Sequence, residues 1–510
     1  MKNKLLVLLA CCFGFLTSCD DWLDVESKKE ISDDVLFSQG IGFRNALNGI
    51  FQECGKPSLY GKSLSWGALS AVSQTYDVVT NQDEIFYFKE FRYNENTNMI
   101  STYSTWWTGM YNIIANINTM LAHIEDTDPK IFNEGEKEKN LIKGEALAMR
   151  AFLHLDIVRL FAPAPVKNKD FKMIPYQDVY PLKITMPQTT EKLLDRIAED
   201  LLAAKDLVAD WDTINGIQQL YPGTPYRRFA DGNTPAAGTF FQYRLMRMNY
   251  PAIIGMLVRT YLYKGDYENA LEYARYFYNT FMTRGTTLLQ GGELALYPYA
   301  PASDFTKGLA TREKKVLDEA LFALYYPDLI ETVENYYESA EETELKGLSL
   351  ARIDEIYDGE EDDYRKVYLI DNYGGEDMTL WRSLKYREVG GAQDTKEGTV
   401  IPNLRMTEVV YALIECEYRI GDKTMALSYL NELRDKRGIK GRTLTMDDIS
   451  TLDQLLDILV NDMEREFVGE GQVFFAHKRL NRNFLSPKSE IIEITDDKVV
   501  FEIPDSQYTN

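Results

Sequence analysis

The chain has 510 residues, of which 45% are apolar, 26% charged and 12% aromatic. So much apolar and aromatic material excludes a disordered chain and indicates a globular protein. Its 79 acidic residues exceed its 56 lysines and arginines, which gives a net charge of −23. Because such a surface repels phosphate groups, the charge argues against general nucleic-acid binding and against attachment to anionic lipids through a basic patch.

The N-terminus has the pattern of a bacterial secretion signal. Two lysines precede an apolar run over residues 5–16, and a small residue and Cys19 follow it. The run is too short for a membrane span, which takes about 20 helical residues, so we predict a signal peptide over residues 1–18. Its end resembles a lipobox, which predicts that Cys19 is lipidated and that residues 19–40 are a tether. An ordinary signal peptide with an incidental cysteine is the alternative.

The periodicity of the remaining chain is mostly helical. Apolar stripes at helical spacing occur at residues 194, 197, 201 and 204 and at residues 452, 455, 459 and 463. Thr451 and Gln454 fit a capping box that opens the second of these helices. Alternating apolar runs are few, and residues 492–503 are the candidate for a small terminal hairpin. We therefore predict a mostly α fold with little β structure.

An internal repeat predicts two helix pairs. The segments that begin at Gly265 and Gly421 match at a Gly, an Asp, an Ala, a Leu and a Tyr. The glycine is expected to end one helix in the left-handed conformation, and the aspartate to cap the next. Ala270 and Ala426 let the paired helices approach. Such tetratricopeptide-like pairs need neighbours to stack on. The predicted antiparallel pairs span residues 253–281 and 408–435.

Three long irregular stretches interrupt the helical pattern. They are rich in glycine, proline and aromatic residues. Loops of this length usually carry function or are disordered, and their aromatic content argues against disorder. We expect a loop-rich excursion over about residues 285–400 within the helix-pair scaffold. The three stretches are residues 220–238, 285–307 and 371–398.

Few residues suggest catalysis. The histidines at positions 123, 154 and 477 form no paired metal motif and are expected in the core or on the surface. The chain has no zinc-protease motif, nucleophile elbow or phosphate loop. Carboxylate pairs of a glycoside hydrolase stay open, because 79 acids guarantee chance pairs. We expect no enzyme activity, no cofactor and no metal site.

Two further features leave alternatives open. The acidic run over residues 358–363 lacks the spacing of an EF-hand, so we interpret it as a solvated loop, with calcium binding as the alternative. Cys416 lies on an apolar helical stretch and is expected to be a buried thiol. A disulfide between Cys54 and Cys416 stays open, because so distant a pair gives no spacing argument.

Several spaced segments of the chain form a recognisable set. They are residues 22–25, 31–34, 43–50, 107–116, 145–152, 405–408, 431–434 and 464–466. They include the Trp-Thr-Gly-Met-Tyr-Asn helix that begins at Trp107 and the Glu-Ala-x-x-x-Arg-Ala helix that begins at Glu145. Together these segments resemble the SusD/RagB family, the glycan-binding surface lipoproteins of Bacteroidetes nutrient-uptake systems. The chain departs from the usual pattern of that family at residues 474–479, where a more acidic ending is common.

The resemblance implies one SusD-like domain over residues 41–510, with an N-terminal part over about 41–215 and a C-terminal part over about 240–510. It also implies a protein anchored in the outer membrane by lipid and exposed at the cell surface. There it would bind an oligosaccharide and deliver it to a SusC-like TonB-dependent transporter. The alternatives are a tetratricopeptide adaptor for proteins, a transporter lid with little sugar affinity, and a lipid-anchored glycoside hydrolase.

Aromatic residues suggest where a sugar would bind. A sugar ring stacks its C–H face on an aromatic ring, while its hydroxyl groups need amide or charged partners. Tyr93, Asn94 and Asn96 offer this mixture before polar loop residues, and Trp381 in a glycine-rich loop is a second candidate. We predict a shallow glycan-binding surface there. If these residues prove to be core, the loops at 220–238 or 285–307 are the next candidates.

Overall fold

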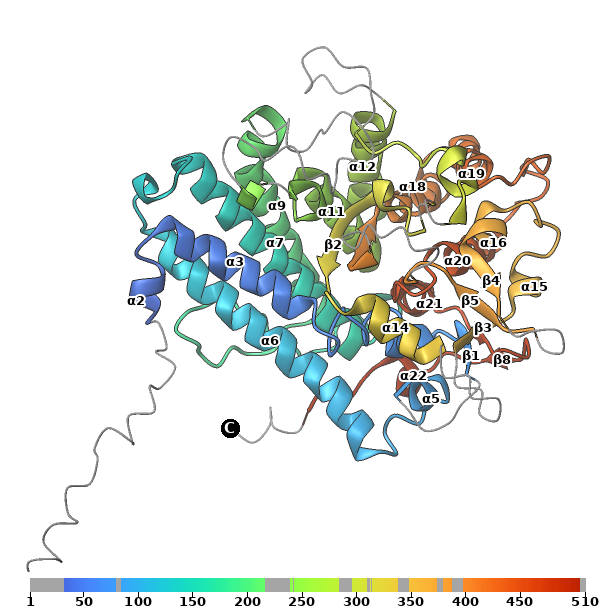
Figure 1. Cartoon of the computed structure of the whole chain (residues 1–510), viewed down its shortest axis with the longest axis horizontal. Helices are drawn as coiled ribbons and strands as arrows, with labels where there is room; N and C mark the ends of the chain where they lie inside the picture. Colours follow the sequence, from blue (N-terminus) through green and yellow to red (C-terminus); the bar gives the residue numbers. More distant parts are fainter. Residues whose placement is uncertain are drawn as a thin grey trace, which may run out of the picture.

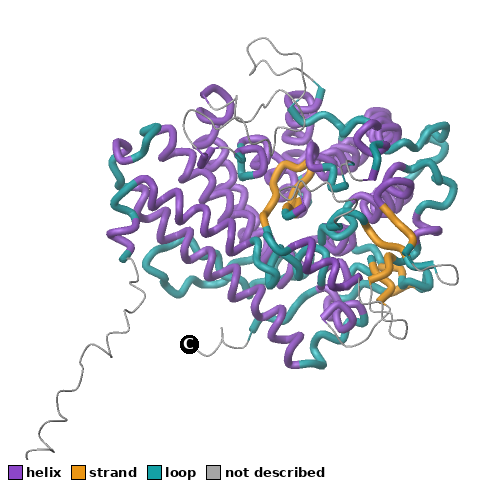
Figure 2. Tube along the Cα trace, viewed as in Figure 1, coloured by secondary structure: helices purple, strands orange, loops and turns teal. Residues whose placement is uncertain are grey.

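The computed structural model describes residues 32–78, 84–215, 239–241, 243–283, 296–309, 312, 314–337, 348–373, 379–387 and 398–504. Helices dominate this part of the chain, and the strands are two to six residues long (Figures 1 and 2). The prediction of a mostly α scaffold of helix pairs with little β structure is confirmed. No helix among the described residues is both long and apolar enough to cross a membrane.

The N-terminal half is mainly helical, and α6 with 29 residues and α7 with 26 are its longest helices. Its helices are α2 (Asp33–Leu36), α3 (Gly40–Cys54), α4 (Ala68–Val72), α5 (Glu84–Lys89), α6 (Thr97–Glu125), α7 (Glu136–Phe161), α8 (Pro165–Asn168) and α9 (Thr190–Ala209), with the short 3₁₀-helix η2 (Pro129–Ile131) and the π-helix η3 (Asp210–Asn215).

The C-terminal half mixes helices with short turns. Its helices are α11 (Tyr250–Lys264), α12 (Tyr267–Phe277), α13 (Ala302–Thr306), α14 (Leu329–Tyr337), α15 (Ile353–Ile356), α16 (Tyr364–Leu369), α18 (Met406–Ile420), α19 (Lys423–Lys436), α20 (Leu452–Glu466), α21 (Gln472–Leu480) and α22 (Asp496–Val499). Its turns are η5 (Thr239–Phe241), η6 (Arg244–Met246), η7 (Tyr278–Met282) and η9 (Leu317–Glu319).

The strands form four antiparallel pairs. These are β1 (Tyr76–Val78) with β3 (Leu348–Leu350), β2 (Ala320–Tyr325) with β6 (Val400–Arg405), β4 (Ile370–Asn372) with β5 (Trp381–Ser383), and β7 (Phe484–Leu485) with β8 (Ile491–Ile492).

The helices form a continuous array. In the series α3, α6, α7, α9, α11, α12, α18 and α19, each helix packs against the next (Figure 1). The helix α7 lies inside the array, and every residue from Gly144 to Phe161 is buried. A Cβ at Gly144 would lie 2.6 Å from Val208 Cγ1, so this glycine lets α9 approach α7 closely. Stacking of this kind buries the apolar face that each helix pair leaves exposed by itself.

The two repeats form the predicted helix pairs, α11 with α12 and α18 with α19. Ala270 and Ala426 are fully buried, as expected for small residues in a helix seam. Gly265 has φ = 83° and ends α11 in the left-handed conformation. The expectation of the same cap at Gly421 is wrong, because its φ is −109°. A Cβ at Gly421 would lie 2.1 Å from Glu417 Oε2, so a larger residue there would displace the end of the Glu417 side chain.

Among the smaller predictions, some are confirmed and one is wrong. Thr451 and Gln454 form the predicted capping box at the start of α20. The hairpin expected over residues 492–503 is wrong, because β8 pairs with the preceding β7 and α22 follows. Two aspartates in the first turn of α22 favour a helix there, through their attraction to its positive N-terminal end. Cys416 is a buried thiol, as expected, and Cys54 is also buried and free.

Candidate functional site

An open cavity lies between the end of α3, the turn η6 and the strands β2 and β6. Its volume is about 500 Å³. Three other cavities in the described part of the chain hold only about 10–50 Å³. We call this large space the tyrosine cavity. Its lining residues are Asn48, Phe51, Gln52, Phe240, Tyr243, Met246, Arg247, Ala323, Leu324, Tyr325 and Val400.

The floor of the tyrosine cavity is apolar and its rim is polar. Met246, Ala323 and Val400 are buried and belong to one small apolar cluster. At the rim, the Tyr243 side chain is 36% exposed and the Tyr325 side chain is 55% exposed. The cavity therefore offers two accessible aromatic rings above an apolar base.

A glycine positions α3 against the tyrosine cavity. Gly55 follows the last residue of α3, and a Cβ there would lie 2.2 Å from the Tyr325 carbonyl oxygen. Only glycine allows this approach without displacing the strand end. It brings the amide side chains of Asn48 and Gln52, which are exposed on α3, to the same rim as Tyr325.

A second glycine seats the strands on the helical array. Tyr325 is paired with Val400 at the ends of β2 and β6. Near the opposite end of the strand pair, α11 packs so closely that a Cβ at Gly255 would lie 2.9 Å from Leu321 Cδ1 and 3.0 Å from Leu404 Cδ2. This contact holds the start of β2 against the helical array.

Arg247 is the charged group of the cavity. Its Nε donates to Glu145 Oε2 at 2.8 Å, and its Nη1 donates to the Phe240 carbonyl oxygen at 3.3 Å. The guanidinium lies over the rings of Phe51 and Phe240, 4.9 and 4.5 Å from their centroids. Its Nη2 is buried and has no hydrogen-bond partner among the described residues. Burial lowers the pKa of Arg247 from its ordinary value, although Glu145 acts in the opposite direction.

A neighbouring ion-pair system holds this arginine in place. Arg244 donates to both carboxylate oxygens of Asp212, at 2.8 and 2.7 Å, and also pairs with Glu145. Asn249 accepts from the Ala252 amide at the start of α11 and donates to the Arg244 carbonyl oxygen. The turn that carries Arg247 is therefore fixed before any ligand arrives. A fixed donor costs less entropy on binding than a mobile one.

Of the predicted site residues, Tyr93 is not on the surface. Its side chain is fully buried, it lies within 5.3 Å of the Phe88 ring and 5.1 Å of the Phe501 ring, and its hydroxyl donates to the Asp497 carbonyl oxygen at 2.8 Å. The expectation of an exposed stacking ring is wrong. The C-terminal segment covers this ring, and a contact over such a sequence distance leaves no local pattern.

Asn94 and Asn96 lie where the polar loop was expected, with Asn94 exposed and Asn96 half-buried. Asn96 has a structural role, because its Oδ1 accepts from the Asn98 amide at 2.8 Å and caps α6. Without the Tyr93 ring beside them, these amides lack the aromatic platform that the prediction required. Their contact with a glycan stays a prediction.

Trp381 is half-buried in β5 and packs against the main core. Its amide donates to Ser349 Oγ at 3.1 Å. No contact among the described residues joins Trp381 to Tyr93, Asn94 or Asn96, so the structure does not bring the four candidates together. The fallback segment 220–238 lies outside the described residues, as do residues 285–295 of the other fallback loop. Cys19 also lies outside them.

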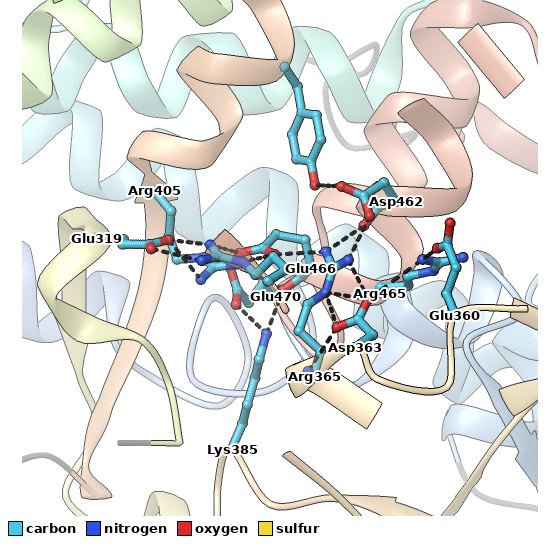
Figure 3. A network of polar contacts seen from close by, with 12 residues as sticks. Glu319, Glu360, Asp363, Arg365, Lys385, Arg405, Asp462, Arg465, Glu466 and Glu470 are labelled. Carbon is cyan, nitrogen blue, oxygen red and sulfur yellow. Dashed lines mark hydrogen bonds and ion pairs between the residues drawn. The ribbon is translucent and has the colours of Figure 1, made fainter. Parts of the chain in front are cut away.

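The acidic run over residues 358–363 belongs in part to a buried charge network (Figure 3). Glu360 accepts from Arg434 at 2.5 Å and also pairs with Arg465, and Asp363 accepts from Arg365 at 2.7 Å. The interpretation of the whole run as a solvated loop is therefore wrong. Six cations meet six carboxylates: Arg365, Lys385, Arg405, Arg434, Arg437 and Arg465 with Glu319, Glu360, Asp363, Asp462, Glu466 and Glu470.

Glu466 is the centre of this network. Arg365, Arg405 and Arg437 donate to its carboxylate at distances of 2.5–2.9 Å. Burial opposes the ionisation of Glu466, but the three arginines outweigh it and hold the pKa of Glu466 well below its ordinary value. Among the described residues, no group of three or more His, Cys, Asp or Glu side chains is placed to hold a metal ion.

Little in the sequence pointed to the tyrosine cavity. Its polar and aromatic residues come from α3, from the turn before α11 and from the end of β2. The adjacent tyrosines Tyr325 and Tyr326, at the end of an apolar run, are the local feature of the sequence at this cavity.

Two family models match the chain. One, described as starch-binding and associating with the outer membrane, matches residues 21–215. The other is the SusD family model, which matches residues 266–496. Comparison with curated protein sequences gives no match.

Solved structures share the fold over nearly the whole chain. A SusD superfamily protein from Bacteroides thetaiotaomicron has a TM-score of 0.67 at 20% identity, covering 91% of this chain and 96% of its own. A SusD-like carbohydrate-binding protein from Bacteroides vulgatus has a TM-score of 0.66 at 16% identity, covering 92% and 96%. A SusD superfamily protein from Bacteroides fragilis has a TM-score of 0.63 at 18% identity, covering 93% and 98%. These structures share the fold, and the two family models, which together match residues 21–215 and 266–496, place the chain in the SusD family.

Proposed function

We propose that the protein is a non-enzymatic lipoprotein of the cell surface that binds an oligosaccharide and delivers it to a SusC-like TonB-dependent transporter. The observation that carries the binding step is the tyrosine cavity. It sets two exposed tyrosine rings beside the amides of Asn48 and Gln52 and the buried, unpartnered Nη2 of Arg247. Rings of this kind stack on sugar faces, and the exposed amides of Asn48 and Gln52 can bond hydroxyl groups.

The net charge of the chain indicates which class of sugar the protein would bind. A net charge of −23 repels anionic polymers. Arg247 adds no net positive field, because Arg244 and Arg247 together face two carboxylates, Glu145 and Asp212. We therefore expect neutral oligosaccharides. Capture beside a transporter needs reversible binding, so a Kd from roughly micromolar to millimolar is expected, or about −8 to −4 kcal/mol.

Titration calorimetry tests the binding step. The non-lipidated Cys19→Ala protein is titrated with neutral gluco-, manno-, xylo- and fructo-oligosaccharides. Removal of a stacking ring from an aromatic platform for nucleobases costs about 1–3 kcal/mol. By that analogy, Tyr243→Ala or Tyr325→Ala is expected to weaken binding by roughly ten- to a hundredfold.

Tyr276→Ala is the matched control, because Tyr276 is also an exposed tyrosine, 40% accessible, but does not line the cavity. Affinities within twofold of the parent in both cavity variants would move the sugar site elsewhere. Failure of the parent protein to bind any of the oligosaccharides would favour the adaptor or lid alternatives.

Membrane attachment is tested separately at Cys19. If this cysteine is lipidated, Cys19→Ala is expected to move the protein from the membrane fraction to the soluble fraction. Each buried CH₂ of an acyl chain contributes about 0.8 kcal/mol, so several long chains make detachment of the parent protein negligible. Cys54→Ala is the control for loss of a thiol. Membrane retention of the Cys19 variant in cells without the transporter would refute the anchor.

A further inference from the structure

A second cavity lies where five helices meet. Side chains of α7, α11, α18, α20 and α21 enclose a space of about 50 Å³. A single water takes about 10–15 Å³ of such space, so the cavity has room for more than one small group. We call it the arginine cavity. Its polar lining residues are Arg159, Arg259, Tyr263, Glu408, Gln472 and Arg479.

Three arginines border the arginine cavity, and a carboxylate holds each of them. The arginine side chains are only 3–10% exposed, so bulk water solvates their charges weakly. Two hydrogen bonds join each pair, which fixes the guanidinium groups in place. The pairs are Arg159 with Asp156, Arg259 with Glu408, and Arg479 with Glu415.

The ion pairs around the arginine cavity leave one positive charge in excess. Glu415 is shared, because Arg419 also donates to it, at 2.8 Å. With this fourth arginine, four positive charges face three carboxylates. Buried charges in proteins are normally paired, since a charge removed from water without a partner is costly. The excess therefore favours an anion in the adjoining space.

Two hydrogen-bond donors of the arginine cavity lack a strong acceptor. The Tyr263 hydroxyl is buried and has no hydrogen-bond partner among the described residues. The acceptor for Arg259 Nη1 is Met256 Sδ, a weak acceptor, at 3.8 Å. Burial raises the pKa of Tyr263, and Arg159 and Arg479 act in the opposite direction. The hydroxyl thus keeps its proton and lies in the field of these arginines.

We propose that the arginine cavity binds one small monovalent anion of the size of chloride. The anion accepts from the Tyr263 hydroxyl and from the Arg259 guanidinium, and it balances the excess positive charge. Sulfate and phosphate are disfavoured, because they are larger and because Glu408 in the lining repels a second negative charge. Since Arg159 belongs to α7 and Arg479 to α21, the anion links the N-terminal and C-terminal halves of the chain.

The arginine cavity is accessible from one side. Gln472, Ala476 and Arg479 are half-buried and belong to α21, so the entrance lies along this helix. Salt screens the negative charge of the protein surface, whereas buried charges are screened much less. An anion at the entrance is therefore attracted by the arginines in spite of the net charge of −23.

Bromide locates the anion directly. Crystals of the non-lipidated Cys19→Ala protein are soaked in sodium bromide, and anomalous differences are measured at the bromine absorption edge. A peak within hydrogen-bond distance of the Tyr263 hydroxyl is expected. The variant Gln472→Glu supplies a carboxylate where Gln472 Oε1 already accepts from Arg159 Nη1 at 3.3 Å. Because that carboxylate takes over the balancing charge, the bromide peak is expected to disappear in this variant.

Thermal unfolding measures anion binding in solution. Chloride replaces gluconate, which is too large for the cavity, at constant ionic strength. Each tenfold rise in chloride above its dissociation constant is expected to raise the melting temperature by about 1 °C for a chain of this size. Tyr263→Phe is expected to weaken chloride binding by roughly two- to tenfold, as for loss of one hydrogen bond. Gln472→Glu is expected to abolish the chloride effect.

Tyr261→Phe is the matched control, because Tyr261 lies on the same helix and does not line the arginine cavity. It is expected to keep the chloride dependence of the parent. Bromide found only at exposed sites would overturn the inference. So would an equal chloride effect in the parent and in Gln472→Glu, because the effect is then a general one of salt. The arginine cavity shares no lining residue with the tyrosine cavity, so oligosaccharide titration is expected to be unchanged in these variants.

Discussion

The tyrosine cavity and the buried charge network contain the same kinds of residue, but only the cavity leaves free space around them. In both, arginines lie over aromatic rings and pair with buried carboxylates, as Arg247 does over Phe240 and Arg405 does over Phe467. The space around them differs: about 500 Å³ beside Arg247, against about 10 Å³ beside Arg405. Buried charge alone therefore does not mark a binding site. To bind a sugar, the charge must border room for a ligand and rings that solvent can reach.

The largest effect is expected from a variant that disrupts the buried charge network. Glu466→Gln removes the charge that three arginines share, and loss of one partner of a buried ion pair costs about 3–5 kcal/mol. Urea denaturation is expected to show a loss of that size in the free energy of unfolding. In the cavity, Tyr325→Ala is expected to cost less than about 1 kcal/mol by the same assay, as for a partly exposed strand residue. Equal losses in the two variants would contradict the division between structural and binding regions.

Glu95→Gln is the matched control for Glu466→Gln. Glu95 pairs with Arg92 on the surface, where its side chain is 59% exposed. Exposed ion pairs contribute about 0–1 kcal/mol, so this variant is expected to unfold at nearly the parent urea concentration.

The second-largest effect on the free energy of unfolding is expected at Tyr93, whose ring was predicted from the sequence to be exposed. Tyr93→Ala is expected to lower the free energy of unfolding by about 3 kcal/mol, the lower end for loss of a buried aromatic ring. Tyr93→Phe keeps the ring and removes only the hydrogen bond to Asp497, so it is expected to cost about 1 kcal/mol. Sugar affinity is expected to stay within twofold in both variants. A large loss of affinity with unchanged stability would restore Tyr93 as a site residue.

The smallest expected effect is an acid sensitivity of the network. Glu466, Asp462 and Glu360 all have a pKa below the ordinary value in the folded protein. Groups of this kind stabilise the fold above their unfolded pKa, about 4–4.5, and lose that contribution as the pH falls towards the folded pKa. A tenfold change in an acid dissociation constant between the folded and unfolded chain corresponds to about 1.4 kcal/mol. Urea midpoints are therefore expected to stay nearly level from about pH 7 to about pH 5 and to fall as the pH drops below about 4.5, and to fall less in Glu466→Gln.

Local patterns predicted local structure well. The repeated Gly-Asp-Ala-Leu-Tyr pattern located both helix pairs, and the capping box at Thr451 is present, because caps and turns depend on neighbours within four residues. The failure at Gly421 is instructive. The same glycine serves a left-handed turn in one copy and a close contact with Glu417 in the other, and the sequence does not distinguish the two uses.

The candidate site could not be predicted from local sequence patterns. Tyr93 looks exposed beside its polar neighbours, but Phe501, more than 400 positions later, covers it. The tyrosine cavity unites residues from four segments of the chain, and the closeness of Gly55 to Tyr325 that joins two of them depends on tertiary packing. Spacing along the chain carries no information about such contacts, whereas the family resemblance identified the fold as a whole.

The neutrality of the charge network determines where the net charge of the protein acts. Since six cations cancel six carboxylates inside, the whole excess of acids behind the net charge of −23 lies outside the network. Salt screens such charges beyond about 8 Å at physiological ionic strength. Two copies of the protein therefore repel each other only at short range, and this repulsion does not act on uncharged molecules between them.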